Sequence, residues 1–442
     1  MAIKSYDVIV IGAGPSGLAC ARELLDKKLK VLILEARDRI GGRVHTIRDS
    51  GIHLPLELGA EFIHGAPKST LDRMESLGLP FIDVIDNHLF LNKRKLESQD
   101  TFWDKMEKVT AKLNPNRKKD RSVKEFTESL GKSIDSKTKK LFTAFVEGFH
   151  SANIEIMGEK ALAEAEQTKD EGLNKAQMFR VPSGYDQFLN GFLSSSVGHR
   201  ESLRLNTIAK KIQWKKNEVK VTAESTSESR SFVFKSKKLV VTVPIGVLNA
   251  PPSTKGAIAW DPIPKGLPAI LSSVHMGHVQ RIVFRFRSRF WEKLSDEPIS
   301  FLHGGPELHF PTWWTQAPIR TPVLMAWQGG PKAMELSTAG ESAIVKMALE
   351  SLSVLTTMPK SFIADQLVSW HTHNWSLDPF SLGAYSYVGV DGVPKSHQLS
   401  RPFMDTIYFA GEATSTSGSR GTVNGAVDSG IRVAHKILRT TR

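Results

Sequence analysis

The feature that most constrains the fold of this chain is a glycine-rich turn near its N-terminus. Residues 7–11 form an apolar stretch, Gly12-Ala13-Gly14-Pro15-Ser16-Gly17 follows directly, and residues 18–25 have the pattern of a helix. In a strand–GxGxxG–helix unit the first glycine permits a sharp turn, the second permits close approach to a pyrophosphate, and the third lets the helix pack on the strand. The unpaired amides of the helix then face the phosphates. The turn therefore predicts a dinucleotide-binding unit.

An acidic residue at the end of the next strand supports the same interpretation. Residues 31–34 are apolar and lead into Glu35, which lies 23 residues after Gly12. At this position a carboxylate accepts hydrogen bonds from a ribose. Because a strand, a helix and an acid accompany the glycines, we favour a dinucleotide site over a chance glycine turn.

The length of the chain predicts two domains, because 442 residues exceed the size at which single hydrophobic cores stop growing. Its single cysteine, Cys20, excludes an intrachain disulfide and a cysteine-based metal cluster, and we expect no metal site. No apolar run is long enough to span a membrane, and no leader-like segment opens the chain. We therefore expect a soluble, cytoplasmic protein.

Basic residues are in excess, since 59 Lys and Arg accompany 46 Asp and Glu and give a formal net charge of +13. The basic clusters, such as residues 117–119 and 235–238, lie in stretches that have the pattern of loops, helix faces and strand edges. We interpret them as solvated surface, with a patch for nucleic acid or an anionic membrane as the alternative. A nucleic-acid partner is therefore not expected.

Two segments rich in small residues follow Glu35. The first begins with Ala36 and Arg37 and ends at Gly42 and Arg43, where glycines permit close approach and Arg43 supplies a planar cation suited to phosphate or a flavin edge. The second, residues 56–65, is a bend that carries an acid and a histidine. Each segment by itself is compatible with an ordinary loop.

Together these segments resemble the flavin-dependent amine oxidase family, which includes monoamine oxidases, polyamine oxidases, L-amino-acid oxidases and lysine-specific histone demethylases. The resemblance continues to two blocks at residues 408–414 and 421–426, so it covers essentially the whole chain. It implies that separate segments close around FAD. The residues expected at the cofactor are Gly12, Gly14, Pro15, Ser16, Gly17, Glu35, Ala36, Arg37, Gly42, Arg43, Gly59, Ala60, Glu61, Ile208, Trp375, Tyr385, Gly411, Glu412, Thr422 and Val423.

The resemblance also implies an α/β fold, with a Rossmann-type FAD-binding domain, a mixed-sheet substrate-binding domain and a helical insertion. The expected boundaries are residues 1–85, 200–265 and 395–442 for the FAD-binding domain, and residues 86–199 and 266–394 for the substrate-binding domain, with the insertion at 95–170.

Local patterns predict individual elements. Ser122 and Glu125 form a capping box at the start of a helix. Further helices are predicted at residues 102–113, 137–151 and 341–355. Strands broken by polar turns are predicted at residues 207–214, 218–223, 231–234 and 239–243.

For catalysis the resemblance indicates five residues. Tyr385 matches one wall of an aromatic cage beside the flavin, whereas Thr422 stands where monoamine oxidases carry the second ring, which favours a bulkier or secondary amine. Glu61 and His64 match positions near the substrate nitrogen or the entrance in some polyamine oxidases, and a structural hydrogen bond is the alternative for His64. Arg281 replaces a lysine that holds a water near flavin N5, and this change predicts slower reaction of the reduced enzyme with oxygen.

The leading hypothesis is therefore FAD-dependent oxidation of a small-molecule primary or secondary amine to an imine, with hydride transfer to flavin N5, hydrolysis of the imine, and reoxidation by O2 to give H2O2. FAD is expected to bind without a covalent link, because Ala384 holds the position of the cysteine that attaches flavin in monoamine oxidases. Two alternatives stay open. One is an FAD-dependent desaturase or dehydrogenase that acts on C–C bonds with another electron acceptor, and the other is a non-catalytic, flavin-stabilised binding protein.

Overall fold

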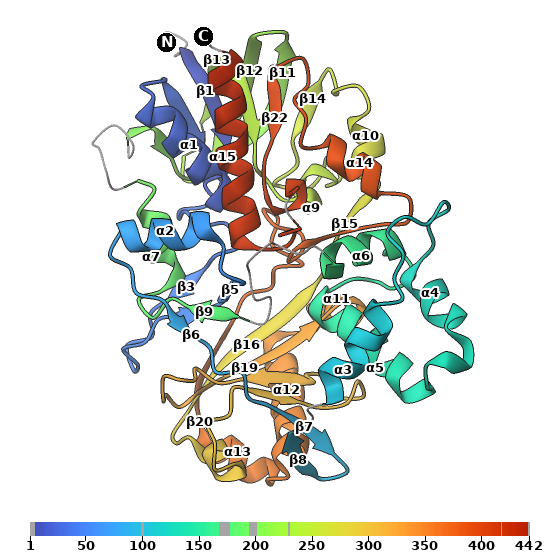
Figure 1. The fold of residues 1–442 in the computed structure, drawn as a ribbon. Helices are drawn as coiled ribbons and strands as arrows, with labels where there is room; N and C mark the ends of the chain where they lie inside the picture. Colours follow the sequence, from blue (N-terminus) through green and yellow to red (C-terminus); the bar gives the residue numbers. More distant parts are fainter. Residues whose placement is uncertain are drawn as a thin grey trace.

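The glycine-rich turn follows β1, an inner strand of a large sheet (Figure 1). The computed structural model describes residues 5–98, 101–167, 177–193, 201–228, 230–416 and 418–440. The order of strands in this first sheet is β10-β2-β1-β13-β12-β11-β14, and β22 also pairs with β13. Their bounds are Ser5–Ile11 for β1, Val31–Leu34 for β2, Leu203–Arg204 for β10, Thr207–Lys215 for β11, Glu218–Ser225 for β12, Ser231–Val241 for β13, Ala259–Asp261 for β14 and Ile407–Phe409 for β22.

Parallel pairing joins the strands that carry the nucleotide motif. β1 is parallel to both β2 and β13, and β22 is parallel to β13, so the ends of these strands lie at the same edge. Helices α1 (Pro15–Asp26) and α15 (Val423–Thr440) lie side by side on one face, although they come from opposite ends of the sequence (Figure 1). A Cβ on Gly430 of α15 would lie 2.2 Å from the Ser16 carbonyl oxygen, so the two helices approach closely there.

A second sheet lies at the other end of the molecule, with strand order β20-β16-β19-β18-β17-β7-β8 (Figure 1). Helix α12 (Glu341–Thr356) packs its apolar side against this sheet, in a core that includes Phe284, Trp313 and Leu352. The strand bounds are His88–Asn92 for β7, Lys95–Ser98 for β8, Val279–Phe286 for β16, Phe301–His303 for β17, Thr312–Trp314 for β18, Val323–Gly329 for β19 and Leu367–Thr372 for β20.

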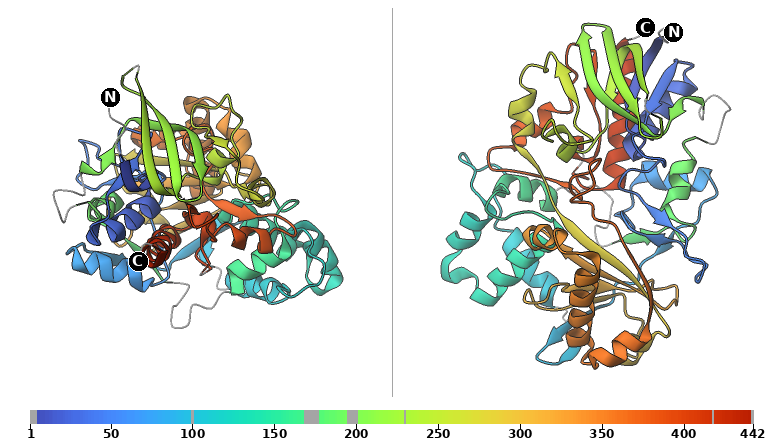
Figure 2. Two further views of the ribbon diagram at one scale, coloured as in Figure 1. Left: turned by 90° about the horizontal axis from the view of Figure 1, so that it is seen from above. Right: turned by 180° about the vertical axis from the view of Figure 1, so that it is seen from behind.

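A helical insertion lies beside the second sheet (Figure 2). It has its own core, which includes Phe126, Phe142 and Val146. The insertion contains α3 (Thr101–Thr110), α4 (Val123–Ser129), α5 (Ser136–Phe149) and α6 (Glu159–Gln167). The predicted capping box is confirmed, because the Ser122 hydroxyl accepts from the Glu125 amide at 3.1 Å and a Glu125 carboxylate oxygen accepts from the Ser122 amide at 2.8 Å.

Three small sheets and several short helices connect these parts. β5-β9-β6 form one small sheet, while β3 pairs with β4 and β15 pairs with β21. The strand bounds are Thr46–Ile47, Leu56–Glu57, Ile63–His64 and Ile82–Asp83 for β3 to β6, Met178–Arg180 for β9, Val274–Met276 for β15 and Ser386–Val388 for β21. The helix bounds are Lys68–Ser76 for α2, Tyr185–Asn190 for α7, Ile245–Leu248 for α9, Leu267–Leu271 for α10, Pro331–Ser337 for α11, Lys360–Gln366 for α13, Val393–Gln398 for α14, and Gly131–Ser133, Phe290–Leu294 and Glu412–Thr414 for 3-10 helices η1 to η3.

The fold class agrees with the expectation, but some segments differ from it in detail. Residues 231–234 and 239–243 were expected as two strands, whereas β13 is one strand from Ser231 to Val241. The lysines between them do not break the strand, because Lys235 and Lys237 point to solvent while Ser236 is buried, which is the alternation of a strand.

The core contacts also differ from the expected domain boundaries. Phe179 and Phe188, expected in the substrate-binding domain, pack in the core that contains Val8 and Val10 of β1. Leu267 and Val274 pack in the core on the other face of the same sheet. The chain therefore passes between the FAD-binding and substrate-binding parts more often than the expected boundaries indicate. The elements responsible are β9, α7, α10 and β15, which bury apolar residues against the first sheet. Within the described ranges, no helix combines the length and hydropathy needed to span a bilayer.

Candidate flavin and substrate site

The glycine-rich turn connects β1 to α1 and leaves the start of the helix open. Gly12 has φ +105°, a conformation that favours glycine, and a Cβ there would lie 2.5 Å from the Thr242 hydroxyl oxygen. A Cβ on Gly17 would lie 2.0 Å from the Gly12 carbonyl oxygen, so Gly17 allows the helix to pack on the turn. Gly14 is the N-cap of α1 and provides no side-chain hydrogen bond, which leaves the first amides of the helix for an anionic ligand.

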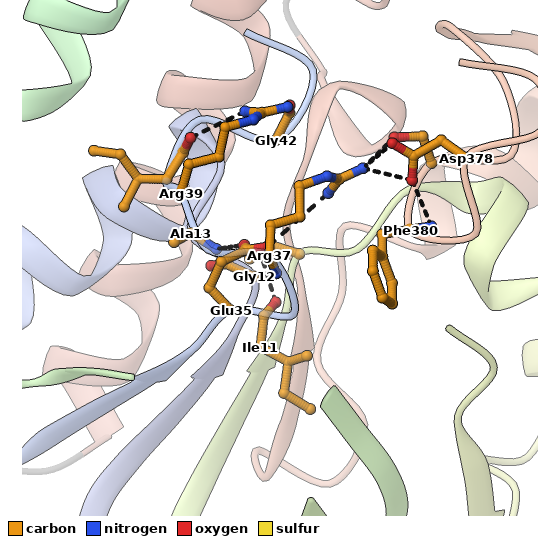
Figure 3. Close-up of polar contacts among 12 residues, drawn as sticks. Ile11, Gly12, Ala13, Glu35, Arg37, Arg39, Gly42, Asp378 and Phe380 are labelled. Carbon is orange, nitrogen blue, oxygen red and sulfur yellow. Dashed lines mark hydrogen bonds and ion pairs between the residues drawn. The ribbon is translucent and has the colours of Figure 1, made fainter. Parts of the chain in front are cut away.

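The carboxylate of Glu35 is fixed beside this turn (Figure 3). It accepts hydrogen bonds from the backbone amides of Ala13 at 2.8 Å and Arg37 at 2.9 Å, and the residue is buried. A carboxylate offers about four acceptor positions. Glu35 is therefore oriented by the protein and retains acceptors for the hydroxyls of a ribose.

Arg37 links the nucleotide end of the site to a segment far along the chain (Figure 3). Its Nη2 atom donates to both carboxylate oxygens of Asp378 at 2.8 Å and to the Ser381 hydroxyl at 2.9 Å. Burial alone would raise the pKa of Asp378, but the hydrogen bond from His373 and the charge of Arg37 hold that pKa well below its ordinary value. Sequence patterns did not indicate Asp378, because its partner is distant in sequence.

Arg43 and Glu412, both expected at the cofactor, bind each other. The Nη1 atom of Arg43 donates to the Glu412 carboxylate at 2.9 Å and to the Ala384 carbonyl oxygen at 2.6 Å. The second carboxylate oxygen of Glu412 accepts from the Ser386 hydroxyl at 2.7 Å and the Gly421 amide at 3.1 Å. This ion pair therefore holds three segments together at the cavity wall.

A cavity of about 1420 Å³ runs through the site. Ligand pockets usually measure about 300–1,000 Å³, so this cavity has room for a dinucleotide and a further molecule. Of the residues expected at the cofactor or in catalysis, Gly17 does not line the cavity. Those that do are Gly12, Gly14, Pro15, Ser16, Glu35, Ala36, Arg37, Gly42, Arg43, Gly59, Ala60, Glu61, His64, Ile208, Arg281, Trp375, Tyr385, Gly411, Glu412, Thr422 and Val423.

Aromatic side chains form the wall of the cavity away from the glycine-rich turn. They come from the insertion, from the second sheet and from the bend before β5, and they are Phe62, Phe90, Phe102, Trp103, Phe145, Phe149, Phe301, Trp314 and Trp327. Trp103 is 49% exposed and Phe149 is 54% exposed, so these two rings mark an opening of the cavity to solvent. Such a wall suits an apolar or aromatic body, and its ring faces also attract cations.

Tyr385 connects the cavity wall to the insertion. Its hydroxyl donates to the Phe149 carbonyl oxygen at 2.5 Å and accepts from the Ser151 hydroxyl at 2.7 Å. Trp375 is buried, and its indole N–H donates to the Leu58 carbonyl oxygen at 2.9 Å. Both rings therefore have fixed positions in the lining.

Thr422, expected at the position of a second aromatic ring, is the N-cap of α15. Its hydroxyl accepts from the Gly425 amide at 3.0 Å and donates to the Ser419 carbonyl oxygen at 2.7 Å. The Thr422 side chain thus caps α15 and also lines the cavity. The small side chain leaves this part of the wall without an aromatic ring.

Glu61 is not a free carboxylate. It forms an ion pair with Arg180 at 3.1 Å and with Arg281, and it accepts from the Trp314 indole N–H at 3.0 Å. Arg281 also donates to the Gly59 carbonyl oxygen at 2.6 Å. Arg180, which lies on β9, was not indicated by any sequence motif, and only the fold brings it to Glu61.

Two further ionisable groups lie close to this cluster. Burial lowers the pKa of His64 to about 4, so its ring is neutral at physiological pH. Burial also raises the pKa of Glu57 to about 7, although the carboxylate accepts hydrogen bonds from the Tyr185 amide and the Thr46 hydroxyl. His64 can therefore act as a hydrogen-bond partner in the cavity but does not add charge to it.

Comparison with protein families and known proteins finds relatives over nearly the whole chain. The model of the family described as flavin containing amine oxidoreductase matches residues 15–438. Polyamine oxidase 2 of Arabidopsis thaliana is 27% identical, and the match covers 98% of this chain and 88% of that protein. Human lysine-specific histone demethylase 2 is 26% identical, over 97% of this chain and 53% of the demethylase.

Solved structures with the same fold include two amine oxidases. Wild-type putrescine oxidase bound to putrescine has a TM-score of 0.81 and 19% identity, and the match covers 99% of both chains. Cyclohexylamine oxidase from Brevibacterium oxydans IH-35A has a TM-score of 0.80 and 18% identity, with 99% of this chain and 100% of the other covered. These likenesses establish the fold.

Proposed function

Because this chain belongs to the family of flavin-containing amine oxidoreductases, we propose that it uses FAD to oxidise a primary or secondary amine to an imine. In this reaction the C–H bond next to nitrogen breaks, and the hydrogen leaves with both electrons as a hydride to flavin N5. The nitrogen lone pair forms the second carbon–nitrogen bond, and loss of a proton from nitrogen leaves the neutral imine. Water then hydrolyses the imine to a carbonyl compound and an amine or ammonia, and O2 takes up two electrons and two protons to become H2O2.

The residues of the site fit FAD. The amides at the start of α1 and the glycines of the turn suit a pyrophosphate, and Glu35 is oriented to accept from a ribose. When bound, the flavin supplies the redox chemistry. Ala384 at the wall offers no thiol, and Cys20 is buried in α1, so we propose that the link is non-covalent. Acid precipitation should then release yellow flavin into the supernatant, whereas a pellet that stays yellow through washing would contradict it.

The observation that carries the proposal is the continuity of the cavity. It reaches from Gly12 and Glu35 at the nucleotide end, past Trp375 and Tyr385, to the aromatic wall around Trp314. A cofactor that fills the nucleotide end would therefore present its reactive ring to a chamber that holds a second molecule. The protein's task is to bind the amine, align its C–H bond and exclude water.

The shape of the chamber supports a bulkier or secondary amine. Thr422 is small where a second aromatic ring would narrow the space, and the lining residues Trp103 and Phe149 are about half exposed. The name of one relative, Polyamine oxidase 2, agrees with this, because polyamines such as spermidine contain secondary amino groups.

A panel of amines tests the proposal under anaerobic conditions, in which the identity of the electron acceptor that reoxidises the flavin does not affect the result. We would mix the oxidised holoenzyme with benzylamine, N-methylbenzylamine, putrescine, spermidine and L-phenylalanine and follow the flavin absorbance. The proposal predicts bleaching by at least one amine, with N-methylbenzylamine faster than benzylamine. If dithionite reduces the bound flavin but no amine does, the proposal is wrong and a desaturase acting on C–C bonds becomes the better account.

A further inference from the structure

The wall of the substrate chamber contains a buried cluster with an unbalanced charge. Glu61 lies between Arg180 and Arg281, and all three residues are at most 6% exposed. The cluster has two guanidinium groups and one carboxylate, and one carboxylate can offset only one guanidinium. The cluster therefore carries a formal charge of +1.

The surroundings of the cluster hold both cations in place without cancelling this charge. The guanidinium of Arg281 lies 5.2 Å from the ring centre of Trp314, and that of Arg180 lies 4.9 Å from the ring centre of Phe62. Arg180 also donates to the Ala317 carbonyl oxygen at 2.9 Å. Aromatic faces and a carbonyl dipole stabilise a cation but leave its net charge unchanged.

Several other ionisable groups lie around the chamber. His64 is neutral, burial raises the pKa of the Tyr385 hydroxyl, and Arg43 is paired with Glu412. Glu57 lies behind Glu61 and titrates near pH 7, so it offsets part of the charge only above that pH. Apart from Glu35 and Arg37 at the nucleotide end, the remaining charged side chains of the lining are Asp86, Glu147, Glu164, Glu166, Lys332 and Arg420, which come from the loop before β7, from α5 and α6, from α11 and from the loop before α15.

We propose that the Glu61–Arg180–Arg281 cluster acts as a fixed positive charge that holds the bound substrate amine in its uncharged form. The inference rests on the proposed amine oxidation. A protonated nitrogen has no lone pair to support departure of the hydride, so only the uncharged amine reacts. A cation in the wall disfavours a second cation in the chamber, and both Glu61 and Arg281 line the cavity that the substrate would enter.

The expected effect is large enough to measure. At an effective dielectric constant of about 20, a unit charge roughly 8 Å away shifts a pKa by about one to two units. The cluster thus lowers the pH at which half of the bound amine is uncharged. In this account Arg180 is a positioning residue that acts through its charge, because it lies behind Glu61 and does not line the cavity.

A series of variants with defined charge separates this role from a structural one. The measurement is the anaerobic rate of flavin reduction against pH, at saturating concentration of whichever panel amine reduces the flavin fastest. Arg180→Met makes the cluster neutral, so its pH midpoint should rise by about one unit. Arg180→Lys keeps the charge, and the double variant Glu61→Gln with Arg180→Met restores +1 while it removes the ion pair. Both should keep the wild-type midpoint.

The double variant decides the matter, since a merely structural cluster would be damaged most when two members are lost. If the double variant shows the raised midpoint of Arg180→Met, or if all midpoints coincide, the inference is wrong. If Arg180→Met does not fold, a second double variant, Glu61→Gln with Arg180→Lys, replaces it. Its cluster carries +2, so its pH midpoint should lie about one unit below that of Glu61→Gln with Arg180→Met.

A measurement without substrate keeps this inference distinct from the proposed function. A fixed cation near the flavin favours the anionic reduced form, so the midpoint potential of the bound flavin, measured by equilibration with a dye, should fall in Arg180→Met and recover in the double variant. If no amine reduces the wild-type flavin, the proposed function fails. If amines do reduce it but neither pH midpoint nor potential follows the charge, only the inference fails.

Discussion

Arg281 is held in place by contacts within the protein and also lines the substrate chamber. Its guanidinium donates to Gly59 and pairs with Glu61, yet the residue lines the cavity. The rigid guanidinium of Arg281, held by these contacts, does not reproduce the flexible ammonium group of a lysine. We therefore predict that Arg281→Lys accelerates reoxidation of the reduced enzyme by oxygen, with little change in the rate of flavin reduction. Stopped-flow mixing of reduced enzyme with oxygenated buffer checks this. Equal reoxidation rates for wild type, Arg281→Lys and Arg281→Met would show that Arg281 does not govern the oxygen reaction.

Tyr385 combines a ring in the cavity wall with a hydroxyl that holds the end of α5 through Phe149 and Ser151. We predict that Tyr385→Ala slows flavin reduction on the order of tenfold or more, because the amine loses a wall that aligns its C–H bond, while FAD affinity changes little. Tyr385→Phe is the matched control, since it keeps the ring and loses only the hydroxyl. Parallel losses of reduction rate and FAD affinity in Tyr385→Ala would instead mark the ring as a core residue.

Among the elements, α15 depends on Thr422 for its first turn. Removal of an N-cap hydroxyl costs about 1 kcal/mol, which for a chain of this size corresponds to roughly 1 °C in Tm. We predict this loss for Thr422→Ala and none for Thr422→Ser, which keeps the hydroxyl. Differential scanning calorimetry of the holoenzyme has the required precision. An unchanged Tm in Thr422→Ala would show that the cap contributes nothing to stability.

At the scale of elements, local features could be predicted from the sequence, whereas contacts between distant segments could not. The glycine-rich turn, Glu35 and the Ser122 capping box were predictable because each depends on residues close in sequence. Arg180 and Asp378 were not, because their roles arise only when β9 meets the bend at Glu61 and when the segment after β20 meets Arg37. The continuity of β13 is not evident from the sequence, because the polar residues between its two apolar stretches resemble a turn, although Lys235 and Lys237 at alternate positions face solvent.

For the molecule as a whole, partly buried histidines predict sensitivity to acid. Burial lowers the pKa of His64 and His45 to about 4 and that of His303 to about 3. The unfolded chain protonates these groups near pH 6.5, before the folded protein does, so stability is full above pH 6.5 and falls as the pH decreases toward 3. At pH 4.5 a single such site costs on the order of 3 kcal/mol.

The variant His303→Gln isolates this effect, because glutamine can keep the hydrogen bond to His88 but does not titrate. The stability contribution of Glu57 has the opposite pH dependence, because its raised pKa gives stability that is lost as the pH rises from about 4.5 to about 7. This contribution is the same in the wild type and in His303→Gln. We predict that denaturant unfolding shows a smaller loss of stability between pH 7 and pH 4.5 for the variant. The same loss in both proteins would contradict the assignment of His303 as a buried neutral group.

The central claim is that an amine in the aromatic chamber gives a hydride from its carbon to the flavin. The most direct test compares, under anaerobic conditions and at saturating concentration, the rate of flavin reduction by the fastest panel amine with that by the same amine deuterated at the carbon next to nitrogen. Cleavage of this C–H bond in the step that reduces the flavin predicts a several-fold slower rate with the deuterated amine. Equal rates at every pH where reduction occurs would contradict the account.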